Sequence, residues 1–275
     1  MNRMSKGFCI LAQNNSKTDY VKQTYALAKS ICKYNPDAKV SIVTNDEVPD
    51  SYKNVFDKII PIPWTDQAND SDWKIENRWK VYHCTPYDRT IVMDCDMLVL
   101  ENIEHWWDYL EKRKVFFVSS VETYRQKQIT NRYYRKVFDS NDLPDIYSAV
   151  YYFEKGKYAQ EFFYLVELIM ENWELFYGKF AGVDYQKWCS FDVSVAIASK
   201  LFGNSNEITH KDSFIKFTHM KPRLQNWQQN FSRWTPVLES YINKQGNLIV
   251  GNFKQTGVFH YVEDDFLTND ILEKL

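Results

Sequence analysis

TIVMDCDMLVL, residues 90–100, is an apolar segment of strand length that two aspartates interrupt, and it decides how the rest of the sequence is interpreted. The apolar residues predict a buried strand of a mostly parallel sheet. Burying Asp94 and Asp96 as unpaired charges would cost several kcal/mol for each, and the two carboxylates would repel one another. A divalent cation at the carboxyl end of the strand, where open α/β sheets bind ligands, would offset this cost. We therefore predict a metal site at the two aspartates; the alternative is that one caps a turn and the other forms an ordinary ion pair.

Composition places the chain among large globular proteins. Its 275 residues can bury a sizeable core, and a net charge of −2 gives no overall basic character that would demand a nucleic acid partner. Nine Trp, 19 Tyr and 18 Phe make the chain unusually aromatic; such rings suit sugars and bases, although most of them lie in cores.

Cysteine usage and hydropathy give expectations about the compartment. The five cysteines are scattered and form no Cys-x-x-Cys pair, which argues against a zinc ribbon and for a reduced chain. A strand-like run begins at Phe8, and no apolar run approaches the roughly 18 residues that span a bilayer. We therefore expect a cytoplasmic protein without a signal peptide or a transmembrane segment.

The N-terminal region predicts a βαβ unit. Residues 7–12 form the first strand, apolar positions at helical spacing continue to about Tyr34, and residues 39–43 form the second strand. Ser16 and Asp19 stand at capping-box spacing before the helix. Such a unit implies parallel strands joined by a right-handed crossover. No Gly-x-Gly-x-x-Gly follows the first strand, so the dinucleotide-binding fingerprint is absent.

Strand and helix patterns alternate through the chain and indicate one α/β domain with a C-terminal extension. We divide it into a nucleotide-binding half, residues 1–120, and an acceptor half that ends in a metal and diphosphate segment, residues 121–275. The further predicted elements are strands at 58–63, 115–118 and 146–153, helices at 73–83 and 157–176, a helix capped by Asn102, a helix capped by Ser190 that ends before Gly203, and short strands near 214–218 and 247–261.

These features together resemble a known family, the GT-A fold nucleotide-sugar glycosyltransferases with a DXD motif. The layout is closest to the retaining glycogenin and galactosyltransferase-like family. Residues 91–99 resemble its DXD strand, and Ala12-Gln13-Asn14 with Tyr20 resemble its uridine-binding loop. Lys80 matches a basic residue that faces the donor in the family.

The match is looser around the sugar pocket. Tyr147-Ser148-Ala149-Val150 stands where the family has Asn-Ser-Gly-Val, and Asp192 stands where it has an Asp-Gln pair. The chain therefore departs from the pattern at Tyr147 and at Val193. These departures concern which sugar is moved and whether its configuration is retained.

The resemblance implies a Rossmann-like sheet flanked by helices and a metal-dependent transfer of a hexosyl or pentosyl group from a UDP-sugar to a hydroxyl acceptor. It implies that Asp94 and Asp96 hold Mn²⁺ or Mg²⁺ together with a histidine, for which His260 and His219 both qualify. Asp192 would align the acceptor or stabilise the developing cationic sugar. The residues implied to contact the donor are Ala12, Asn14, Tyr20, Lys80, Met93, Ser148 and Lys221.

The acceptor is suggested only by local charge. Residues 122–136 are rich in Arg and Lys with interleaved tyrosines, which predicts either a solvated segment or a lid or acceptor surface for an anionic molecule. A second basic group contains Lys216, Lys221, Arg223 and Arg233 with Trp227 and Trp234. An anionic glycan or a hydroxymethylated base in DNA would suit both, while a neutral oligosaccharide or a protein hydroxyl stays equally open.

Two other classes of function remain as alternatives. Haloacid-dehalogenase-like phosphatases also place Asp-x-Asp at the end of an apolar strand, and Ser119, Lys221 and Asp264-Asp265 resemble their remaining motifs. Met97-Leu98 stands where that family has Gly-Thr, and a complete βαβ unit precedes the motif here. The second alternative is a sugar- or nucleic-acid-binding protein without turnover, although pure binding gives no evident reason for a buried pair of carboxylates.

Overall fold

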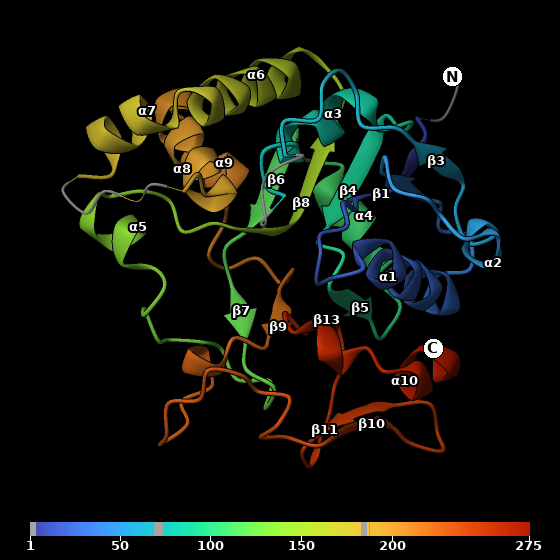
Figure 1. Cartoon of the computed structure of the whole chain (residues 1–275). Coiled ribbons are helices and arrows are strands. Elements are labelled where there is room, and N and C mark those ends of the chain that lie inside the picture. The colour runs from blue at the N-terminus through green and yellow to red at the C-terminus, as the bar shows by residue number, and fades with distance from the viewer. Residues whose placement is uncertain (1–3, 69–73, 183–185, 187) are drawn as a thin grey trace.

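A six-stranded sheet forms the centre of the computed structural model, which describes residues 4–68, 74–182, 186 and 188–275 (Figure 1). Its strand order is β3-β2-β1-β4-β8-β6. The first four strands in this order pair in parallel, whereas β8 runs antiparallel to both β4 and β6. The expected mostly parallel α/β sheet is therefore confirmed. The strands are β1 Lys6–Leu11, β2 Val40–Val43, β3 Lys58–Ile60, β4 Arg89–Met93, β6 Val115–Val118 and β8 Tyr147–Glu154.

Helices cover both faces of this sheet, and the strands alternate their side chains between them. On one face, α6 (Lys157–Glu171) and α8 (Phe191–Phe202) share a core with Val92 of β4. On the other face, α1 (Tyr20–Tyr34) and α4 (His105–Leu110) share a core with Ile91 and Met93. The sheet is buried on both sides, as the continuous apolar run of β4 predicted.

A second sheet has the order β5-β13-β9-β7, and Figure 1 shows it beside the carboxyl end of β4. One prediction is corrected here: residues 90–100 form two strands in two sheets, and Asp94–Asp96 connect them. The strands are β5 Met97–Val99, β7 Val121–Glu122, β9 Phe217–His219 and β13 Val258–His260. A third sheet contains β10 Ser240–Ile242, β11 Leu248–Val250 and β12 Phe253–Lys254.

Several helix boundaries differ from the sequence predictions. The helix predicted at 73–83 begins outside the described residues and is reduced to a 3₁₀ turn η1, Arg78–Lys80, followed by α3, Val81–Cys84. The helix predicted at 157–176 divides at Asn172, where α6 ends and α7 (Trp173–Phe180) begins. The remaining helices are α2 Asp50–Lys53, α5 Lys136–Ser140, α9 Ser205–Ile208, α10 Asn269–Lys274, and the 3₁₀ turns η2 Pro222–Leu224 and η3 Asp264–Phe266.

The structure confirms one of the predicted helix N-caps and differs from the sequence prediction at two others. Ser190 caps α8 as expected, and left-handed Gly203 ends that helix. Asp19, not Ser16, caps α1 by accepting from the Lys22 N–H. Asn102 does not cap α4, because the helix begins after Glu104; the Asn102 side chain instead accepts from the Glu104 N–H at 3.0 Å. Among the helices that the structure describes, none has the length and apolarity needed to cross a membrane.

Candidate metal and donor site

The Asp94–Asp96 connection lies at the junction of the two main sheets. β4 ends at Met93 and β5 begins at Met97, so both aspartates stand between paired strands. The Asp94 N–H donates to the Ala149 carbonyl of β8 at 2.9 Å, and the Asp96 carbonyl accepts from the Tyr261 N–H at 3.0 Å. The backbone of this connection is therefore fixed from both sides.

His260 completes a three-residue cluster with the two aspartates. β13 pairs antiparallel with β5 in a register that places His260 opposite Met97. Its Nε2 lies 3.0 Å from the Asp96 Oδ2. One ligand atom from each of Asp94, Asp96 and His260 lies within 4.8 Å of the others, and no other such cluster occurs among the described residues. The sequence motif and the last strand thus meet at one point.

Both carboxylates have a positively charged or polar neighbour. Arg78 of η1 forms an ion pair with Asp94 and also donates to the Ser148 carbonyl at 3.4 Å. Burial alone would raise the pKa of Asp96, but His260, a backbone N–H and Arg78 together outweigh burial and hold that pKa below its ordinary value. Asp96 is therefore ionised at neutral pH.

His219, the other predicted histidine, lies directly behind His260. β9 and β13 are parallel with His219 beside His260, and the two rings stack with centroids 4.8 Å apart. Burial, with smaller effects from His260 and Lys221, holds the pKa of His219 well below its ordinary value, so this imidazole is neutral. The structure brings both histidines to the site, and the cluster with the aspartates contains His260.

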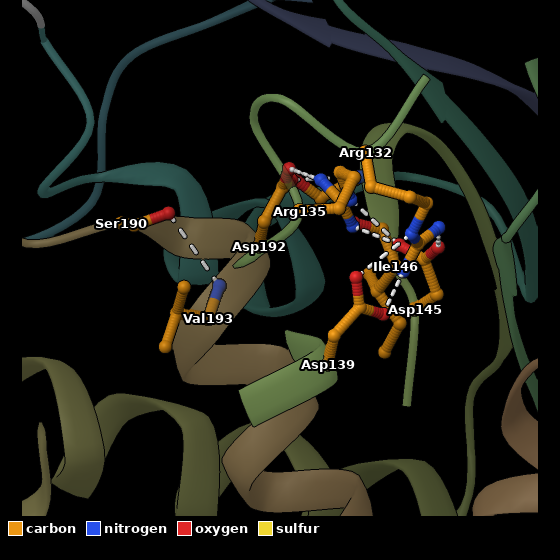
Figure 2. A network of polar contacts seen from close by, with 9 residues as sticks. Arg132, Arg135, Asp139, Asp145, Ile146, Ser190, Asp192 and Val193 are labelled. Carbon is orange, nitrogen blue, oxygen red and sulfur yellow. Dashed lines mark hydrogen bonds and ion pairs between the residues drawn. The ribbon is translucent and has the colours of Figure 1, made fainter. Parts of the chain in front are cut away.

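Asp192 lies in the first turn of α8 and is held from two directions (Figure 2). It accepts from the Ser148 N–H at 2.9 Å and from the Arg135 Nη1 at 3.2 Å. Burial would raise the pKa of Asp192, but Arg135 and the Ser148 hydrogen bonds hold it below its ordinary value. Its side chain keeps 31% exposure, so this carboxylate is both fixed and accessible.

The loop after β1 lies beside the aspartate connection. Ala12 is the first residue after β1, and its N–H donates to the Val43 carbonyl at 2.9 Å. Asn14 is fixed by an N–H bond to Asp46 at 2.6 Å and by accepting from the Val21 N–H at 3.1 Å. Burial, with Cys95 and Asp96 nearby, raises the pKa of Tyr20 to about 12. The loop predicted to bind the base thus has fixed contacts and lies near the cluster of Asp94, Asp96 and His260.

The two predicted lysines have different surroundings. Lys80 is 2% exposed and donates to the Thr65 carbonyl, and burial lowers its pKa. The Lys221 ammonium lies 4.9 Å from the centroid of the Tyr134 ring, and burial lowers its pKa while Asp192 opposes that shift. Lys221 therefore adjoins the site.

Arg78 is the cation that contacts Asp94, and its sequence context predicted no role for it. The available signal was its place two residues before Lys80 in the same predicted helix. Because that segment forms a 3₁₀ turn followed by a short helix, periodicity could not show which of the two side chains faces the aspartates.

The two departures from the family pattern are buried in this structure. Val193 is 2% exposed and belongs to the core between the large sheet and α6. The Tyr147 ring lies 4.0 Å from the Arg135 guanidinium carbon and edge-on to His219. Neither side chain offers the amide that the family has at these positions.

Much of the predicted basic surface is neutralised by the chain itself. Arg132 and Arg135 pair with Asp139, Asp145 and Asp192, Lys216 pairs with Glu122, and Arg233 pairs with Glu263 and Asp265. Trp234 is fully buried. Arg125 and Arg223 lie over the rings of Tyr124 and Tyr133, at 5.3 and 4.3 Å.

The arrangement of elements is similar to that of solved glycosyltransferases. A structure of an active-site mutant of LgtC matches 94% of this chain and 87% of its own, at 15% identity and a TM-score of 0.51. A structure of the galactosyltransferase LgtC with donor and acceptor sugar analogues matches 71% of this chain and 70% of its own, at 16% identity and a TM-score of 0.45. GlyE of Streptococcus pneumoniae TIGR4 matches 77% of this chain at 13% identity and a TM-score of 0.48, and the match spans only 46% of GlyE.

The likeness to the LgtC mutant, which extends over nearly the whole chain, shows that this protein has the GT-A glycosyltransferase fold. At this level of identity it shows the fold alone. No family model and no curated protein sequence matches the chain.

Proposed function

We propose that this protein is a metal-dependent glycosyltransferase that moves a sugar from a UDP-sugar to a hydroxyl acceptor. The observation that carries the proposal is the meeting of Asp94, Asp96 and His260 at the carboxyl end of β4. Open α/β sheets bind their ligands at this edge, and the GT-A fold makes a nucleotide sugar the appropriate ligand class.

The donor set fits a divalent cation of the Mn²⁺ type. The two carboxylates suit both Mn²⁺ and Mg²⁺, and the imidazole favours Mn²⁺. His260 rather than His219 would be the third ligand, since its Nε2 already faces Asp96 and its ring separates His219 from the aspartates in the stacked pair. When bound, the ion neutralises the diphosphate and stabilises it as a leaving group.

The remaining residues suit the parts of a UDP-sugar. Ala12, Asn14 and Tyr20 would bind the nucleoside through the ordered loop after β1, next to Met93 and the aspartates. Lys221 and Arg78 would counter the phosphate charges, and Ser148 would fix the sugar beside Asp192. Lys80, which was predicted to face the donor, would act only through the loop that carries Thr65.

Asp192 is proposed as the catalytic carboxylate. It is ionised, partly exposed and fixed by Ser148 and Arg135. A fixed anion in this place stabilises positive charge that develops on the sugar, or aligns the hydroxyl that attacks.

The acceptor is proposed only as a hydroxyl compound. Binding of an anionic acceptor would depend on Arg125, Lys127 and Arg223.

The residues that resemble the remaining phosphatase motifs make other contacts in this structure. The Ser119 hydroxyl donates to the His210 carbonyl at 3.0 Å. Asp265 pairs with Arg233, and Asp264 accepts from Thr18. Asp94, which would be the nucleophile, pairs with Arg78.

The experiment is thermal unfolding of the protein with UDP, GDP, CMP, ADP or NAD, each with Mn²⁺ and with EDTA. UDP with Mn²⁺ is expected to raise the unfolding midpoint, since a hundredfold excess over Kd adds about 2.7 kcal/mol of stability. The shift should vanish in EDTA and in Asp96→Asn, which removes a ligand charge without changing shape. Asp108→Asn, a substitution of the same kind in α4, should keep it.

Release of UDP from UDP-sugars then separates an enzyme from a binder. A transferase releases UDP when an acceptor is supplied, whereas a binding protein holds its ligand unchanged. No shift with any nucleotide would refute the proposal and favour the phosphatase alternative, which phosphatase assays would then test.

A further inference from the structure

We infer that Arg135 is a positioning residue that orients Asp192, an inference that rests on the proposed function of Asp192. Arg135 is 3% exposed, and it stands 57 residues before Asp192 in the sequence. Figure 2 shows its guanidinium between the Asp192 carboxylate and Asp145.

The guanidinium plane is held between two rings. Its central carbon lies 3.8 Å from the centroid of Phe138 and 4.0 Å from that of Tyr147. Stacking on both faces restricts the guanidinium to one plane, because a planar cation over an aromatic ring cannot tilt without losing contact. Tyr147, one of the departures from the family pattern, is thus one of the two rings that hold the Arg135 guanidinium.

The edge of the same plane is held by three acceptors. The Arg135 Nε donates to the Asp145 Oδ1 at 2.6 Å, Nη2 donates to the Ile146 carbonyl, and Nη1 donates to the Asp192 Oδ2 at 3.2 Å. With its plane and two of its donors fixed, the guanidinium presents Nη1 to Asp192 from a single direction.

Ser148 supplies the opposing constraint. The Asp192 Oδ1 accepts from the Ser148 N–H, while Oδ2 accepts from Arg135. Each carboxylate oxygen therefore has its own donor, one from β8 and one from Arg135, which fixes both the position and the rotation of the carboxylate. A buried ion pair often adds little to the stability of a protein. The pair of Arg135 with Asp192 is therefore better explained by the orientation that it gives to the Asp192 carboxylate.

Arg132 is the natural control. It pairs with Asp139 and Asp145 at the outer end of the same network, has a 44% exposed side chain, and makes no contact with Asp192 among the described interactions. It lines a cleft of about 1100 Å³ with Asp139 and Asp145, whereas Arg135 and Asp192 do not line that cleft. Replacing Arg132 disturbs the network without removing a donor from Asp192.

The first test is a double-mutant cycle on stability, which needs no activity. The first cycle compares the urea unfolding of Arg135→Met, Asp192→Asn and the variant that carries both changes. A matched control cycle uses Arg132→Met instead of Arg135→Met. The drop in midpoint caused by Arg135→Met should be clearly smaller in the Asp192→Asn background, because the two groups act as one unit. Arg132→Met and Asp192→Asn should be additive. Additive effects for Arg135 would overturn the inference.

The second test measures UDP release from UDP-sugars in Mn²⁺, with water or an added hydroxyl compound accepting the sugar. Arg135→Met should lower kcat at least about tenfold with KM for the donor within about twofold, since the lost interaction orients a catalytic group rather than binding the donor. Arg135→Lys should recover part of kcat, and adding Arg135→Met to Asp192→Asn should cost little more. Arg132→Met should stay within about twofold of the unmodified protein.

Each outcome supports or overturns the inference. If Arg135→Met does not fold, Arg135→Lys replaces it in both cycles. A loss of kcat that is equal in both Asp192 backgrounds would show a purely structural role. A protein that releases no UDP under any condition would refute the proposed function, and the stability cycle would still decide whether Arg135 and Asp192 are coupled.

Discussion

At the scale of single residues, the site is built so that each carboxylate has a specific partner. Asp94 pairs with Arg78, Asp96 lies against His260, and Asp192 is held by Arg135 and Ser148. Such pairing offsets the cost of placing three acidic groups in a partly buried region. Each carboxylate has a different partner residue, so the three can be tested separately.

The two histidines should differ in their effect on metal affinity. His260→Ala removes a proposed ligand and should weaken Mn²⁺ binding by about tenfold or more, whereas His219→Ala removes only the ring stacked behind it and should have a smaller effect. Titration calorimetry with Mn²⁺ measures both. Equal losses, or a larger loss for His219→Ala, would contradict the assignment of His260.

Asp192 should contribute stability that depends on pH. Its pKa in the folded protein lies below the ordinary value of 3.8, so the contribution is fully present above that value. It is lost as the pH falls through the lower folded pKa, because the unfolded chain then binds the proton first.

We therefore expect Asp192→Asn to be less stable than the unmodified protein at neutral pH and the difference to shrink as the pH falls below 3.8. Urea unfolding at a series of pH values measures it. A difference that stays constant down to the acid limit would mean that Asp192 is not held in its charged form by Arg135 and Ser148.

At the scale of elements, the start of α8 links helix capping to the site. Ser190 accepts from the Val193 N–H at 3.5 Å, and Asp192 lies between these two residues. The cap fixes the first turn of the helix, and the helix dipole favours a negative charge at this end. The start of the helix and the placement of the carboxylate therefore depend on the same turn.

Ser190→Ala should lower the free energy of unfolding by about 1 kcal/mol and should also lower the rate of sugar transfer, because the turn that carries Asp192 loses its cap. Thr268→Ala is the matched control: Thr268 caps α10 by accepting from the Ile271 N–H at 3.3 Å, and α10 lies beside α1, whose Lys29 donates to the Leu272 carbonyl. It should lower stability similarly without affecting the rate. An equal fall in rate for both variants would indicate a general effect of stability.

At the scale of the whole molecule, the site is a junction of distant segments. The aspartate connection, the loop after β1, the turn η1, the start of α8 and the strands β9 and β13 all meet where the two main sheets adjoin. Charge is distributed on the same scale, since most of the arginines in the predicted basic surface pair with acids of the chain or lie over its tyrosine rings.

This distribution predicts a shallow salt dependence for an anionic acceptor. Of the nine cations of this surface, Arg132, Arg135, Lys216 and Arg233 pair with carboxylates of the chain, and Arg125, Lys127, Lys136, Lys221 and Arg223 have no described carboxylate partner. With at most about five cations left to contact an anionic acceptor, affinity for a sulfated oligosaccharide should fall by no more than about 130-fold between about 50 and 200 mM salt, against roughly 6000-fold if all nine were free. Arg125→Ala should flatten the dependence further, and Arg132→Met should not. A complete absence of salt dependence would exclude electrostatic docking, and a much steeper one would require other cations.

The sequence by itself determined the local features. The apolar runs predicted the strands of a mostly parallel sheet, Ser190 and Gly203 predicted both ends of α8, and the two aspartates marked where the chain leaves the sheet. These features depend on burial, capping and backbone conformation within a few residues, and such signals are contained in the sequence.

The tertiary structure decided which distant residues meet. The choice between His219 and His260 depends on the strand register of β5, β13 and β9, and the contacts of Arg78 and Arg135 depend on how a turn and a loop pack against β8 and α8. One residue of slip in a strand reverses which face a side chain occupies, so no local pattern could specify these contacts. Arg135 shows this most clearly: the sequence places it in a basic stretch, and only the fold buries it between two rings against the carboxylate of Asp192.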